Sequence, residues 1–159
     1  MSQDELTLYI LVGESLCMIQ HLKDALSHSI VLKKEVKRPH DISKQVADRL
    51  IDKYRFYTLG KAIKIVKEEE LFSEQLQKEL ERLLVERNWL VHRSIAHDRD
   101  EWDLNISRGK LFERTKHITR QSQTLLIQIE EDLMKFSESN GVDMSRVRDE
   151  ISKHRRKTN

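Results

Sequence analysis

Residues 73–95 read SEQLQKELERLLVERNWLVHRSI, and this stretch decides the fold. Its apolar residues recur at spacings typical of one helix face, at Leu76, Leu80, Leu83, Leu84, Leu90 and Val91. Positions three or four apart lie on the same side of a helix, so this pattern predicts an amphipathic helix. Ser73 is a favoured first cap and Glu74 suits the first turn. The helix is expected to begin there and to continue to about Ile95.

The same spacing recurs on both sides of this helix. Residues 5–36 predict a first helix that exceeds thirty residues, and Pro39 ends it or interrupts the chain just beyond it. Asp41 is the expected cap of a second helix, which breaks at residues 58–60 before continuing over 61–70. After a polar loop at 97–105, residues 107–137 predict the last long helix. Asn140-Gly141 then supplies a left-handed stop before a short final helix over 143–154.

The composition supports this helical pattern. The 159 residues suit one domain, and only four glycines and one proline interrupt a chain that is 38% hydrophobic and 35% charged. Sheet architectures need more turn residues, so we expect an all-α fold. We place a helical domain at residues 1–140 and a short basic C-terminal helix or tail at 141–159.

Charge and cysteine content limit the functional classes. The net charge is only +2, so no field from the whole chain drives binding to nucleic acid or to an anionic membrane. Cys17 is the only cysteine, which excludes an internal disulfide and the usual cysteine-rich zinc sites. The acidic N-terminus is unlike a signal peptide, and no apolar run is long enough to span a membrane. The sequence predicts a cytoplasmic protein without a membrane partner.

Arg87 is the residue that first suggests chemistry. It continues the row Leu80, Leu84 and Val91, so a permanent cation lies on or beside a face that should be buried and needs a partner or a function. Asn88 and His92 are four apart and share a face. Arg87 and His92 are separated by about 140° around the helix and about 7.5 Å along it, which a long arginine side chain can bridge.

A fixed cation, an amide and a titratable imidazole suit phosphodiester cleavage without a metal. A base removes the proton of the ribose 2′-hydroxyl, the freed oxygen attacks its own phosphorus, and a cation stabilises charge on the phosphoryl oxygens. Histidine titrates near neutrality, and arginine donates to phosphate at two points. The spacing alone is a weak signal, since an arginine and a histidine often occur near each other on a helix.

The surrounding sequence resembles a known family. Residues 86–93, ERNWLVHR, resemble the HEPN motif of arginine, a polar residue, a few further residues and histidine. Residues 58–63, TLGKAI, resemble the threonine-leucine-glycine step found in some members. The resemblance implies a bundle of four or five helices that forms a homodimer with the motif helices at the interface. It also implies that both copies of the arginine and histidine line one cleft.

For this chain the resemblance implies a metal-independent endoribonuclease that needs no cofactor. Arg87 would hold the scissile phosphate, His92 would act as base or position the 2′-hydroxyl, and Asn88 would orient either side chain or the RNA. Apart from the resemblance, Arg93 and His97 lie next to the motif, and proximity alone makes them candidates to extend the substrate site, with a solvated polar loop as the alternative. The resemblance further suggests a toxin or antiviral effector that is restrained by an antitoxin such as a nucleotidyltransferase-like protein.

Other interpretations of the same residues remain. A zinc site built from His92, His97 and Asp98 is improbable, because the seven histidines are scattered along the chain. Trp89 could stack on bases, but an interface role is favoured for it. The basic residues after Asp143 are expected to be a solvated tail, with RNA contact as the alternative. The alternative function is a non-catalytic HEPN-like dimer that binds RNA, a nucleotide or a partner protein.

Overall fold

A computed structural model of the protein describes residues 2–38, 42–94 and 105–157. Every regular element in these ranges is helical, which confirms the all-α class expected from the sequence. The elements are, in order, α1 (Gln3–Ile30), the π-helical segment η1 (Val31–Val36), α2 (Lys44–Arg55), α3 (Leu59–Glu68), α4 (Glu74–His92), α5 (Asn105–Ser139) and α6 (Ser145–Lys157). None of the described helices combines the length and the apolar character needed to cross a bilayer.

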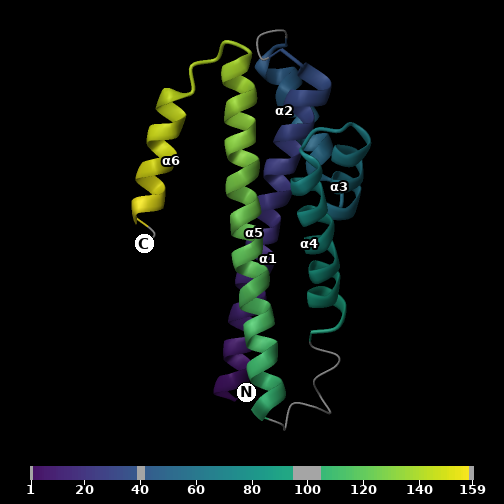
Figure 1. Cartoon of the computed structure of the whole chain (residues 1–159), viewed down its shortest axis with the longest axis vertical. Helices are drawn as coiled ribbons and strands as arrows, with labels where there is room; N and C mark the ends of the chain where they lie inside the picture. Colours follow the sequence, from purple (N-terminus) through teal and green to yellow (C-terminus); the bar gives the residue numbers. More distant parts are fainter. Residues whose placement is uncertain (1, 39–41, 95–104, 158–159) are drawn as a thin grey trace.

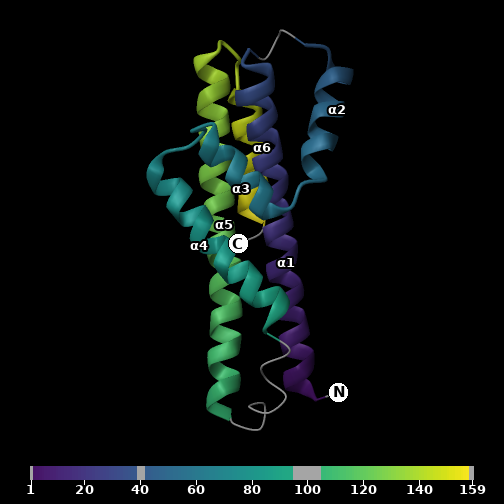
Figure 2. The same ribbon diagram turned by 90° about the vertical axis from the view of Figure 1, so that its right-hand side faces the viewer.

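Two long helices, α1 and α5, lie side by side along the long axis of the molecule and run in the same direction (Figure 1). Near the start of both, Arg108 Nη1 donates to Asp4 Oδ2 at 2.5 Å. Farther along, Ser15 Oγ donates to the carbonyl oxygen of Thr115 at 3.1 Å. Because parallel neighbours cannot be joined by a short turn, the chain returns through α2, α3 and α4. Figure 2 shows α4 crossing the pair in the opposite direction.

Small polar side chains line the contact between α1 and α5. Ser15, Thr115 and Ser122 are fully buried, and Ser15 Oγ lies 2.7 Å from Thr119 Oγ1. Short side chains let two helices approach closely, and the hydroxyls of Ser15 and Thr115 bond to helix carbonyls, so that burying them is tolerated. The larger apolar residues form the core around this seam, at Leu22, Leu26, Ile30, Ile63, Val66, Leu80, Leu83, Ile118, Leu125 and Ile129.

The first helix changes form before it ends. It was expected to run as one helix to residue 36, but the α-helix stops at Ile30 and a π-helix follows, with Lys37 N donating to Leu32 O at 2.9 Å. In a π-helix residues five apart share a face, whereas in an α-helix they are about 140° apart. The change therefore keeps both Val31 and Val36 buried. Lys37 then ends the segment with a positive φ of 57°.

Hydroxyl caps set the starts of α2 and α3. Ser43 Oγ accepts from Val46 N at 3.4 Å, so Ser43 caps α2 in place of the expected Asp41, which lies with Pro39 outside the described residues. Thr58 Oγ1 accepts from Lys61 N at 3.2 Å. The break expected at residues 58–60 is therefore confirmed, and α3 begins there.

The second half of the chain follows the sequence prediction closely. Ser73 caps α4 as expected, but the helix ends at His92, and Ile95 lies outside the described residues. The start of α5 comes two residues earlier than expected, at residue 105. Gly141 has a φ of 83°, which confirms the left-handed stop. The final helix over 145–157 is shifted by a few residues from the expected 143–154.

Candidate functional site

The candidate site lies on the C-terminal half of α4. Ser73 Oγ accepts from Leu76 N at 3.3 Å and satisfies one of the free amides at the start of the helix. Lys78 and Glu74 form an i,i+4 ion pair of 2.5 Å on the exposed side. Leu80 and Leu83 are fully buried, which anchors the first half of α4 in the core. The helix therefore carries Arg87, Asn88 and His92 on a backbone that is fixed at its other end.

The residues in the helix row that contains Arg87 become more exposed toward the C-terminal end of α4. Leu80 is fully buried, Leu84 and Arg87 are half-buried, and Val91 is 43% exposed. The apolar stripe was expected to continue to about Ile95, with Arg87 on or beside the buried face, but this row is buried only in the first half of the helix. Arg87 therefore stands at the boundary between core and solvent, where a guanidinium can reach a ligand without full desolvation.

The start of α3 explains why the row becomes uncovered. Gly60 packs against Leu84, since a methyl group placed on Gly60 would lie 3.6 Å from Leu84 Cδ2. α3 and α4 run antiparallel, as the bond from Gln77 Nε2 to Ile63 O also indicates. Arg87 and Val91 lie beyond the first turn of α3, so α3 does not extend over them. The threonine-leucine-glycine step thus sets where the motif emerges from the bundle.

The structure brings some of the expected site residues together and separates others. Arg87 Nη1 donates to Asn88 Oδ1 at 3.1 Å. Asn88 and His92 are both exposed and lie one turn apart on the same face of α4. Arg87 and His92 point to directions about 140° apart, as their spacing on a helix requires. Within one chain the motif therefore does not form a closed Arg-His pair among the described residues.

Of the two residues that were candidates to extend the site, the structure describes Arg93 but not His97. Arg93 is exposed, and its backbone amide donates to the carbonyl oxygen of Trp89 at 2.8 Å, which ends α4. His97 lies outside the described residues, as does Asp98 of the alternative zinc site. Among the residues that are described, no three His, Cys, Asp or Glu side chains gather in an arrangement suited to a metal ion.

Arg114 on α5 is a neighbour of the motif that the sequence did not indicate. Its guanidinium binds Glu86 at two points, 2.8 Å from Nε to Oε2 and 3.1 Å from Nη2 to Oε1. The same group stacks on Trp89, with Cζ 3.7 Å from the ring centroid. Arg114 therefore fixes the residues on either side of Arg87 and Asn88 against α5. The sequence could not identify Arg114 as the partner of Glu86, because α5 contains several basic residues that could pair with this carboxylate.

Trp89 has a role within the chain that the sequence analysis did not anticipate. Its ring is half-buried and lies under the guanidinium of Arg114. The intermolecular contact expected for Trp89 stays a prediction.

Comparison with known proteins adds nothing to this geometry. No family model matches the chain, and neither a curated protein nor a solved structure matches it.

Proposed function

We propose that this protein is a metal-independent endoribonuclease of the HEPN type, in which Arg87 and His92 act together between two copies of the chain. The observation that carries the proposal is the environment of Arg87. The residue as a whole is half-buried, and within the described residues the hydrogen bond of its guanidinium is to Asn88 alone, on the exposed side of α4. By contrast, Arg114 and Arg148 each bind a carboxylate at two points. A guanidinium whose hydrogen bond is to a neutral group keeps its charge and its other donors for an anion.

The proposed chemistry needs only these side chains. His92 takes the proton of the ribose 2′-hydroxyl, and the 2′-oxygen attacks the adjacent phosphorus. The bond from phosphorus to the 5′-oxygen breaks, and the departing oxygen takes a proton from water, which leaves a 2′,3′-cyclic phosphate and a free 5′-hydroxyl. Arg87 binds the phosphoryl oxygens on which charge develops, and Asn88 orients the guanidinium through its side-chain oxygen.

A second copy would supply what one chain lacks. Arg87 and His92 diverge around α4, so one protomer presents them to different sides. Apolar side chains next to them are exposed, with Val85 at 65% and Val91 at 43%. Apolar residues around polar ones are typical of a surface that another protein covers. A homodimer built through α4 would place the arginine of one copy near the histidine of the other.

The deciding experiment is cleavage of a mixed RNA pool in EDTA by the purified protein, with the 3′ ends mapped. We expect cyclic phosphate ends from the wild type. We expect cleavage to fall by at least about 100-fold in His92→Ala and in Arg87→Ala, since a general base or a charge-stabilising group contributes that much. Arg49→Ala and His21→Ala are matched controls, because both residues are exposed and neither lies on α4.

Folding and assembly are measured on the same samples. His92→Ala should keep its circular dichroism and its sedimentation behaviour, since an exposed side chain contributes little packing. Cleavage that persists in both motif variants would reject the assignment of the site. Absence of cleavage by the wild type would favour the non-catalytic dimer that binds RNA, a nucleotide or a partner protein. Cleavage that appears only after removal of a bound partner would support a toxin or antiviral effector under an antitoxin.

A further inference from the structure

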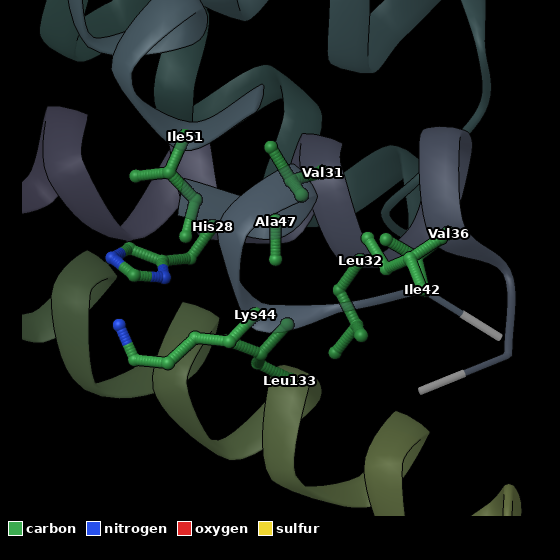
Figure 3. Close-up of a pocket in the computed structure, with 9 residues that line it drawn as sticks. All are labelled: His28, Val31, Leu32, Val36, Ile42, Lys44, Ala47, Ile51 and Leu133. Carbon is green, nitrogen blue, oxygen red and sulfur yellow. The ribbon is translucent and has the colours of Figure 1, made fainter. Parts of the chain in front are cut away.

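A second site lies at the other end of the bundle, where the chain forms a pocket of about 380 Å³. Its walls come from α1, η1, α2 and α5, and Figure 3 shows the lining residues. Seven of them are aliphatic: Val31, Leu32, Val36, Ile42, Ala47, Ile51 and Leu133. Pockets for small ligands are commonly of this size and mostly apolar, with a few polar groups that fix the orientation.

The polar groups of the pocket are gathered at one end. His28 and Lys44 are the two lining residues with polar side chains, and both carry nitrogen donors. In the view of Figure 3 the imidazole of His28 and the ammonium of Lys44 lie on the same side of the pocket, opposite Leu32 and Ile42. No carboxylate is among the residues that line the described pocket. The pocket is therefore aliphatic along its length and offers hydrogen-bond donors at one end.

The π-helical segment builds the aliphatic wall. Because residues five apart share a face in a π-helix, Val31 and Val36 both line the pocket. An α-helix over the same residues would turn one of them away by about 140°. The change of helical form that interrupts the first helix is thus also what widens this wall.

The two donors have acidic neighbours outside the pocket, and these leave donor capacity free. Lys44 Nζ contacts Asp48 Oδ2 at 2.6 Å in an exposed i,i+4 pair, a type of pair that is weak. An ammonium has three donors, so it can bind Asp48 and a further acceptor together. His28 Nε2 lies 3.5 Å from Asp24 Oδ2, and Arg55 also binds Asp24 and lowers the pKa of that carboxyl. The other ring nitrogen of His28 faces a ligand as a donor only in the imidazolium form, so Lys44 is the principal donor of the pocket.

We propose that this pocket binds a small straight-chain monocarboxylate, with the alkyl chain against Val31, Val36 and Ile51 and the carboxylate at Lys44 and His28. The ligand class follows from the lining: aliphatic walls bind an alkyl chain, and the ammonium of Lys44 at one end binds an anionic head group. This site is separate from α4, so the proposal does not depend on the ribonuclease.

The test is calorimetric titration of the full chain with decanoate, below its micellar concentration, beside decanol and decylammonium of the same chain length. We expect decanoate to bind about tenfold more tightly than decanol, with decylammonium weaker still. Equal affinity for the three would overturn the proposed recognition of a carboxylate. Absence of decanoate binding would overturn the site itself.

Variants locate the binding. Lys44→Gln should weaken decanoate about tenfold, whereas Lys64→Gln should not, although Lys64 forms a comparable exposed i,i+4 pair with Glu68 on α3. Ala47→Phe should abolish binding by filling the pocket. Because that variant could disturb the fold, methyl chemical shifts of Val31, Val36 and Leu133 are followed on adding decanoate to the wild type. Shifts confined to other methyl groups, or a Lys44→Gln variant that binds normally, would contradict the proposal.

Discussion

Lys33 shows at the residue scale how one side chain joins three parts of the fold. Its side chain is only 9% exposed, and its ammonium pairs with Asp132 of α5. It also donates to the carbonyl oxygen of Leu71 at 2.9 Å and lies 4.8 Å from the centroid of Phe72 and 5.6 Å from that of Phe136. The interaction thus joins η1, the turn before α4 and the end of α5.

Replacing this lysine should destabilise the whole bundle. We expect Lys33→Met to lower the free energy of unfolding by about 1–3 kcal/mol, because a buried charge-assisted hydrogen bond and its partners are lost while the aliphatic stem is kept. Urea denaturation measures the change. Lys34→Met is the matched control, since Lys34 is the next residue and pairs with Glu69 at the surface, and its curve should hardly move. Equal effects of the two variants would show that Lys33 has no special role.

Single residues were predictable from the sequence only where they broke a pattern. Arg87 could be singled out because a charge interrupts an apolar row, and the structure places it at the edge of the core. Lys33 could not, because it begins the charged run Lys33-Lys34-Glu35, which has the appearance of a solvated surface. Arg114 was missed for a related reason: its partners Glu86 and Trp89 are distant in sequence, and only the tertiary fold brings them together.

At the scale of the element, local chemistry determined most helix starts. Hydroxyl caps at Ser73 and Thr58 lie where the apolar spacing begins, so these starts could be located in advance. The π-helical form of residues 31–36 could not, since α- and π-helices differ by one residue in their hydrogen bonding and tertiary contacts select between them. The cap of α2 was misplaced because both Asp41 and Ser43 are suitable residues.

The role of Ser73 as the cap of α4, the helix that carries the candidate site, can be tested by mutation. Ser73→Ala should lower the free energy of unfolding by about 1 kcal/mol, because the amide of Leu76 loses its acceptor. Ser73→Asp should restore stability, since a carboxylate also accepts this bond and suits a helix N-terminus. Urea denaturation and hydrogen exchange at the Leu76 amide check both. If the Asp variant is as unstable as the Ala variant, the hydroxyl acts through something other than capping.

For the molecule as a whole, the sequence predicted the all-α class but not which helices pack against each other. Amphipathic spacing and few chain breakers suffice to predict an all-α chain. That α1 and α5 are parallel neighbours depends on contacts between residues about a hundred positions apart, such as Ser15 with Thr115. Their small buried hydroxyls look like surface residues in the sequence. The exposure of the candidate site could not be predicted from the sequence for the same reason. The start of α3 determines which face of α4 is exposed, and this depends on tertiary contacts.

The proposed boundary at residue 140 leads to a prediction about the final helix. α6 is joined to α5 through Arg148, whose guanidinium binds Glu138 at 2.8 Å and Glu131 at 3.1 Å. No side chain described in α6 is buried, and Val147 is 42% exposed. A chain that ends at Asn140 should therefore unfold in one transition with a midpoint within about 4 °C of the full chain, which is roughly 1 kcal/mol at this size. A fall of about 10 °C or more in calorimetry would instead make α6 part of the core domain.

If the basic end of the chain contacts RNA, the same truncation should weaken RNA binding and reduce its dependence on salt, because fewer counterions are released.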